Sequence, residues 1–131
     1  MTKRTINPWT WQEKFGFVQA NEFSNFKRVI FCAGIVSVDE NGGLLHPGDM
    51  VKQMRQILNN LETLLNQADA KFADVARLVY YTTDVTKFTE SSHVLVEQFK
   101  RYDCQPATSL IGVSSLFHPE CVFEVEATVV V

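Results

Sequence analysis

The chain has 131 residues, of which 46% are hydrophobic and 21% are charged, a usage typical of a globular protein rather than of a disordered segment. Twelve Lys and Arg against fifteen Asp and Glu give a formal net charge of −3, and no basic cluster, Lys100-Arg101 included, is longer than two residues. Binding to phosphate backbones needs a concentrated basic face, so we expect no nucleic-acid partner. The length predicts a single domain over residues 1–131.

The first third of the chain is predicted to form strands. A short strand is expected at 17–20, and the uninterrupted apolar run at 29–36 is typical of a strand covered on both faces. Turn residues at 39–43 end this run.

A long amphipathic helix is predicted between Pro47 and Ala68, where apolar residues recur every three or four positions. Pro47 suits its first position, where a backbone N–H needs no partner. A β-rich run at 76–85 follows. A second, shorter helical stripe ends near Arg101 and consists of Phe88, Leu95, Val96 and Phe99.

Two strands close the chain, a brief one at 109–113 and a longer one at 122–131. The longer strand alternates, so that Glu124 and Glu126 share one face. The predicted fold class is α/β (α+β), a mixed β-sheet with two helices packed on one face, in the order β-β-α-β-α-β-β. The other face of such a sheet also needs cover, and closed symmetric self-association is the usual solution.

The N-terminus, the apolar runs and the spacing of Cys and His set our expectations for cellular location and metal binding. The N-terminus has no signal-peptide core, and no apolar run is long enough to cross a bilayer, so we expect a cytoplasmic protein without a membrane partner. Cys32, Cys104 and Cys121 have no CxxC spacing and are interpreted as reduced thiols, although two of them could pair in an oxidising compartment. No histidine shares a ligand-spaced motif with a cysteine, so no metal site is predicted.

Five segments, in this order and with compatible spacing, resemble the RidA (YjgF/YER057c/UK114) family of small trimeric proteins. They are 31–34 (FCAG), 56–61 (QILNNL), 78–88 (LVYYTTDVTKF), 106–109 (PATS) and 122–127 (VFEVEA). The resemblance covers nearly the whole chain. It implies a RidA/chorismate-mutase-like fold and a homotrimer that binds a small molecule at its subunit interfaces.

The resemblance also implies a reaction. Family members hydrolyse reactive imines and enamines to a keto acid and ammonia without a metal or cofactor; an Arg holds the substrate carboxylate and a Glu of the terminal strand helps position the attacking water. The Glu corresponds to Glu124, but Thr108 stands at the Arg position. A threonine hydroxyl cannot replace the two charge-assisted hydrogen bonds of a guanidinium, so altered substrate specificity is expected.

The predicted site therefore combines a catalytic Glu124 with a set of substrate-binding positions. Phe17 stands where the family has a tyrosine and Ser92 where it has an asparagine. If Glu126 and Glu124 are partly enclosed together, their repulsion would favour keeping one protonated, which suits acid–base catalysis. The candidate substrate-binding residues are Thr108, Ser109, Gly34, Phe17 and Ser92.

Three functions are in competition at this point. The favoured one is an imine or enamine deaminase of altered specificity. The alternative is a non-catalytic ligand-binding or regulatory trimer, and an endoribonuclease or translation inhibitor ranks lowest because of the acidic balance. Whether Arg101 or a cation of a neighbouring subunit replaces the lost Arg is left open. Cys104 has no activating neighbour in the sequence and is expected to be inert.

Overall fold

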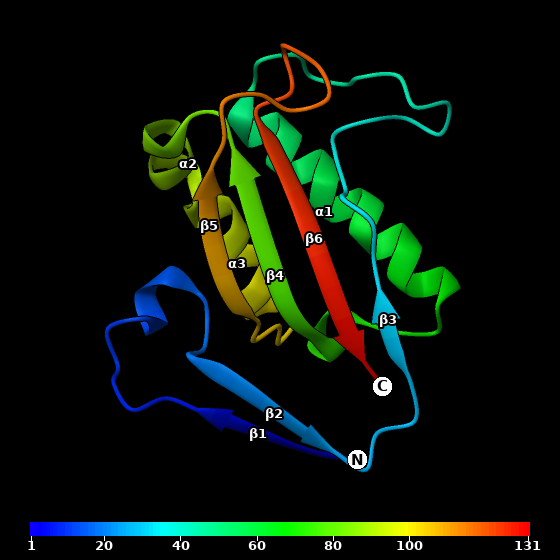
Figure 1. Cartoon of the computed structure of the whole chain (residues 1–131), viewed down its shortest axis with the longest axis vertical. Coiled ribbons are helices and arrows are strands. Elements are labelled where there is room, and N and C mark those ends of the chain that lie inside the picture. The colour runs from blue at the N-terminus through cyan, green and yellow to red at the C-terminus, as the bar shows by residue number, and fades with distance from the viewer.

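A four-stranded mixed sheet runs through the middle of the molecule and carries all three α-helices on one face (Figure 1). The computed structural model describes residues 1–131. In the strand order β3-β6-β4-β5, β4 and β5 are parallel and the other pairs are antiparallel. The strands are β3 (Val29–Phe31), β4 (Val75–Thr82), β5 (Ala107–Gly112) and β6 (Phe123–Val130). The predicted fold class is confirmed.

The long predicted helix is α1 (Met50–Gln67), which begins three residues later than expected. Gly48 has a left-handed φ of +71°, which a helix cannot contain, so the prediction that Pro47 occupies the first helical position is wrong. Asp49 is the N-cap instead, and its carboxylate accepts a hydrogen bond of 3.0 Å from the backbone N–H of Lys52. The buried face of α1 consists of Gln53 and the apolar residues Met50, Met54, Ile57, Leu58, Leu61 and Leu65.

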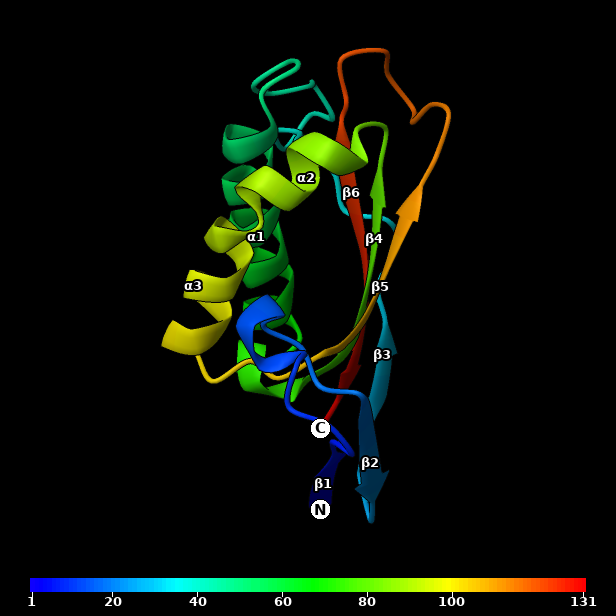
Figure 2. The same cartoon turned by 90° about the vertical axis from the view of Figure 1, so that its left-hand side faces the viewer.

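The second predicted helix is divided into α2 (Val85–Ser91) and α3 (His93–Arg101). They meet at Ser92, whose hydroxyl donates a hydrogen bond of 3.0 Å to the carbonyl oxygen of Thr89. Such a local side-chain bond competes with the helical pattern. Both helices pack beside α1 on the sheet, as the edge-on view shows (Figure 2).

The apolar run at 29–36 is not one continuous strand. After β3 ends at Phe31, Cys32 still bonds to Ala127, and pairing with β6 resumes where Ile35 and Val125 exchange two hydrogen bonds of 2.7 and 3.0 Å. Between these pairings the run advances from 32 to 35 while β6 advances only from 127 to 125, so it holds one extra residue. This bulge brings Gly34 close to β6.

The N-terminal segment forms a structure that the sequence did not suggest. A two-stranded antiparallel sheet stands apart from the main sheet. Of the strand predicted at 17–20, Val18 makes an isolated bridge to Ala107, and Ala20 is the first residue of a strand in the small sheet. The remaining elements are β1 (Thr2–Ile6), β2 (Ala20–Ser24) and the 3-10 turns η1 (Glu13–Phe15) and η2 (Phe72–Asp74). No helix is both long and apolar enough to cross a membrane.

The core fills the space between the helices and the main sheet, and the opposite face of that sheet has no helix on it (Figure 2). We call that opposite surface the open sheet face. Phe31 on this face is 81% exposed, an unusual state for a phenylalanine on a strand. The open sheet face includes Val29, Phe31, Arg77, Tyr81, Ile111, Glu124 and Glu126.

Candidate functional site

Glu124 and Gly34 lie against each other on the open sheet face. The bulge brings the backbone of Gly34 so close to β6 that a Cβ at this position would lie 2.9 Å from both the carboxyl carbon and Oε2 of Glu124. Any other residue at Gly34 would therefore displace the carboxylate. Sequence analysis named both residues, and the structure brings them together.

The surroundings of Glu124 make its ionisation less favourable. Partial burial, and then repulsion from Glu126, raise the pKa of the Glu124 carboxyl above its ordinary value. Glu126 lies on the same face, as predicted, and its Oε1 accepts a hydrogen bond of 2.7 Å from the hydroxyl of Tyr81. The site thus has one carboxylate in partial enclosure and one tied to a neighbouring strand.

Three other predicted residues, Phe17, Ser92 and Thr108, meet in a separate cavity of about 210 Å³. It lies between β5, the junction of α2 with α3, and the segment after η1. We call it the aromatic cavity, because four of its lining residues carry aromatic rings. None of its lining residues carries a charge. The lining consists of Phe15, Phe17, Tyr80, Phe88, Thr89, Ser92, Leu95, Thr108 and Leu110.

Within one chain, Thr108 and Glu124 point to opposite faces of the sheet. Thr108 pairs with the buried Leu78 and faces the helices, whereas Ser109 faces the open side, where its Oγ accepts a hydrogen bond of 3.1 Å from Arg77. The predicted site residues therefore form two groups. One group, Phe17, Ser92 and Thr108, lines the aromatic cavity, and the other, Gly34, Ser109 and Glu124, lies on the open sheet face.

Arg101 does not supply a cation to the aromatic cavity of its own chain. It ends α3, and its guanidinium carbon lies 5.4 Å from the ring centroid of Tyr102. Sequence reasoning missed Arg77 and Tyr81, which accompany the acidic pair on the open sheet face. Their alternation along β4 was a signal, but it becomes informative only once the pairing of β4 with β6 is known.

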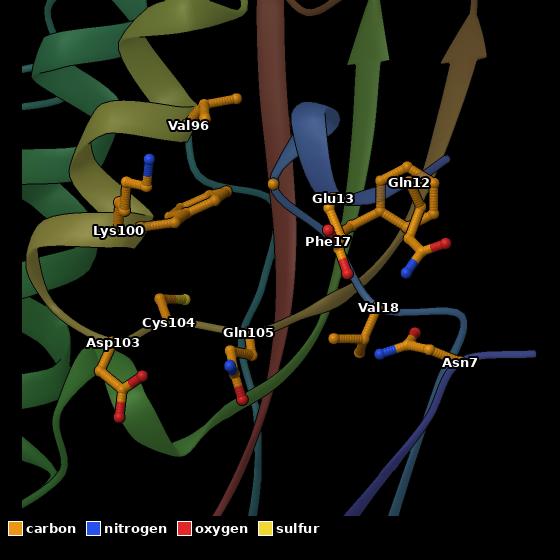
Figure 3. A pocket seen from close by; sticks show the side chains of 12 residues that line it. Asn7, Gln12, Glu13, Phe17, Val18, Val96, Lys100, Asp103, Cys104 and Gln105 are labelled. Atoms are coloured by element: carbon orange, nitrogen blue, oxygen red, sulfur yellow. The ribbon is translucent and has the colours of Figure 1, made fainter. Parts of the chain in front are cut away.

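A larger cavity of about 400 Å³ lies between the N-terminal segment and the end of α3 (Figure 3). It includes Cys104, where burial raises the pKa of the thiol to about 12, so the thiol is protonated at neutral pH, as expected of an inert cysteine. The amide of Gln12 is buried there without a partner in the chain. Phe17 is the one predicted site residue in its lining, so the predicted residues do not converge there.

The side chains also give no arrangement suited to a metal ion, since no group of three His, Cys, Asp or Glu residues comes together. The chemistry available at Glu124 is that of a carboxylate next to exposed backbone and apolar surface. Such a group can accept and return a proton.

Comparison with known proteins places this geometry in a family. The model of the family described as Endoribonuclease L-PSP matches residues 15–131. A RutC family protein of Pyrococcus horikoshii is 31% identical over 111 residues, which are 85% of this chain and 83% of that protein. The 3-aminoacrylate deaminase RutC of Acinetobacter baylyi is 26% identical over 109 residues, 83% of this chain and 82% of that protein.

Among solved structures, YyfB of Yersinia pestis, a protein of unknown function of the conserved Rid family, matches with a TM-score of 0.88 and 34% identity over the full length of both chains. The fold that carries the two groups of predicted site residues is thus a known architecture. The chain belongs to the Endoribonuclease L-PSP family, which is the YjgF/RidA family.

Proposed function

We propose that the protein is a homotrimeric deaminase that hydrolyses reactive imines or enamines, with Glu124 assisting the attack of water. The observation that carries this proposal is the Glu124 carboxylate, which lies in partial enclosure against the backbone of Gly34 with a raised pKa. The relative named 3-aminoacrylate deaminase supports the reaction class, because an aminoacrylate is an enamine.

The proposed reaction is R₂C=NH + H₂O → R₂C=O + NH₃. The oxygen of water bonds to the imine carbon, and the carbon–nitrogen bond then breaks as the nitrogen takes up both protons of the water. Ionised Glu124 accepts one of these protons and returns it to the departing nitrogen. A carboxyl with a raised pKa suits both steps. The balance requires no oxidant, reductant or organic cofactor.

A trimer would join the two groups of predicted site residues. One chain holds Glu124 and Thr108 on opposite faces of its sheet, so a complete site needs Glu124 of one copy beside the aromatic cavity of the next. The apolar side chains of the open sheet face, above all Phe31, support burial against neighbouring copies. Closed rings with heterologous contacts have this head-to-tail arrangement.

Thr108 supports one alternative, a trimer that binds a ligand without catalysing its hydrolysis. Loss of the guanidinium removes the group that would hold a carboxylate substrate in place, and with it the positioning that catalysis needs. RNA cleavage has less support, since the open sheet face presents two carboxylates and a single arginine.

The test is ammonia release from imines generated in situ, comparing the wild type with Glu124→Gln. The panel includes 2-iminobutanoate, 2-iminopropanoate and imines without a carboxylate. We expect the wild type to accelerate hydrolysis over buffer for at least one imine, and Glu124→Gln to lose on the order of 100-fold of that acceleration. Glu126→Gln, the same change two residues away, is the matched control and is expected to lose much less.

Two outcomes would contradict the proposal. No acceleration for any imine, together with thermal stabilisation by a ligand, would favour the non-catalytic trimer. Equal losses in the two glutamine variants would show that Glu124 has no special part in the reaction.

A further inference from the structure

The floor of the aromatic cavity is preformed by core side chains. Tyr80 and Phe88 lie with ring centroids 5.4 Å apart, and both contact Phe123, at 5.8 and 5.5 Å. All three rings are buried, so they cannot turn aside without disturbing the core. An apolar cavity of roughly 150 Å³ is known to take up benzene. The aromatic cavity, at about 210 Å³, therefore has room for a phenyl ring or a branched alkyl group.

Thr89, Ser92 and Thr108 carry the aliphatic hydroxyl groups around the cavity, and Tyr80 adds a phenol. The hydroxyl of Ser92 donates a hydrogen bond of 3.0 Å to the carbonyl oxygen of Thr89, and the hydroxyl of Thr89 donates one of 2.9 Å to the carbonyl oxygen of Val85. Both protons are thus used inside the helices. The hydroxyl of Thr108 is the aliphatic one that remains to meet a ligand, and it offers one uncharged hydrogen bond.

No Lys, Arg or His lines this cavity, and Arg101 lies against Tyr102 instead. A carboxylate that entered would lose its hydration without gaining a charged partner from the lining of this chain, which is strongly unfavourable in apolar surroundings. An uncharged group of the same size would lose little and gain contact with four rings. The cavity thus discriminates by charge.

We propose that the substrate is an imine that carries no carboxylate and has an uncharged phenyl-sized or branched alkyl group, which the aromatic cavity binds. This inference rests on the proposed function and names its substrate class. For an aldimine the step is R–CH=NH + H₂O → R–CHO + NH₃, with R in the cavity. Imines of this kind arise when a primary amine is oxidised at the carbon that bears its nitrogen, so the supplying reaction is an amine oxidation rather than the breakdown of an amino acid.

A binding experiment tests the inference independently of turnover. Phenylacetamide and phenylacetate have the same shape and differ in charge, so their dissociation constants for the wild-type protein can be compared directly by calorimetry. We expect phenylacetamide to bind more tightly by at least about tenfold. Thr108→Arg should reverse this order, because the guanidinium restores a charged partner for the carboxylate.

Turnover gives the second measurement. 2-Phenylethanimine, made in situ by an amine oxidase, is compared with 2-imino-3-phenylpropanoate, made by an amino-acid oxidase, each relative to its own rate in buffer. We expect the wild type to favour the first by on the order of 100-fold. Thr108→Val keeps the shape of the side chain and adds no charge, so it should keep that preference. This variant provides the comparison should Thr108→Arg fail to fold.

The outcomes separate this inference from the proposed function. Tighter binding of phenylacetate to the wild type, or equal acceleration of both imines, would overturn the inference while leaving a working deaminase. Selective binding of phenylacetamide without turnover of any imine would uphold the charge selectivity of the cavity and overturn the deaminase, and with it the assignment of an imine as substrate.

Discussion

Glu124 is subject to two influences that act in the same direction on its protonation. Partial burial raises the pKa of the carboxyl, and the nearby negative charge of Glu126 raises it further. The proposed reaction needs the ionised form of Glu124 to take a proton from water. Turnover should therefore rise with pH across the raised pKa of this group.

The Glu126→Gln variant tests this assignment. It removes the repulsion and keeps the burial, so the pKa of Glu124 should fall part of the way toward its ordinary value. The acidic limb of the kcat/KM profile should then move to lower pH. A limb that stays in place or moves to higher pH would show that another group controls it.

For single residues, the sequence predicted which side chains share a face of a strand better than it predicted which residues touch across strands. The alternation at 122–131 was enough to place Glu124 and Glu126 on one face, and the structure agrees. The contact of Glu124 with Gly34 was not predictable, because it depends on one extra residue in a strand about 90 positions away. Pairing register sets such contacts, and it is not written in local periodicity.

The elements of the fold are tied together by a buried glutamine that the sequence did not single out. Gln53 on α1 donates from Nε2 to the carbonyl oxygens of His46 and Glu120, at 2.9 and 2.8 Å. Its Oε1 accepts a hydrogen bond of 3.0 Å from the N–H of Val122. One fully buried amide thus joins the helix to the loop before it and to the loop that precedes β6.

Gln53→Met would keep the size of this side chain and remove its three hydrogen bonds. The N–H of Val122 would then be left without a partner, whereas the carbonyl oxygens of Glu120 and His46 would keep the N–H groups of Gly48 and Asp49. We expect the free energy of unfolding to fall by about 3 kcal/mol, measured by urea denaturation at fixed protein concentration. Gln67→Met, the same substitution at an exposed position of the same helix, should change stability little. Similar effects of the two variants would contradict the role given to Gln53.

Sequence patterns predicted elements well where one periodicity dominates. The stripe of α1 and the alternation of β6 were recognised because each buries one face against the core. The start at Pro47 was wrong because the left-handed Gly48 and the cap by Asp49 override proline's preference. The division at Ser92 and the small sheet of β1 with β2 depend on a single side-chain bond and on pairing between distant segments.

The molecule as a whole has two layers, a layer of helices and a main sheet with one uncovered face. Helices cover one face, and the open sheet face carries both the exposed Phe31 and the Glu124 site. The sequence indicated this imbalance, because two helical stripes cannot cover both faces of the sheet. The chain belongs to the YjgF/RidA family. The proposed function depends on a site shared between neighbouring copies.

Subunit complementation tests that shared site most directly. Glu124→Gln removes the proposed proton carrier, and Leu110→Trp fills the aromatic cavity, so each variant alone should be inactive. Co-expressed with different tags, the two variants form mixed trimers that can be isolated. In a head-to-tail ring each mixed trimer has one site with both halves intact, so we expect about one third of the wild-type rate. Mixed trimers as inactive as the single variants would contradict a site built between neighbouring copies.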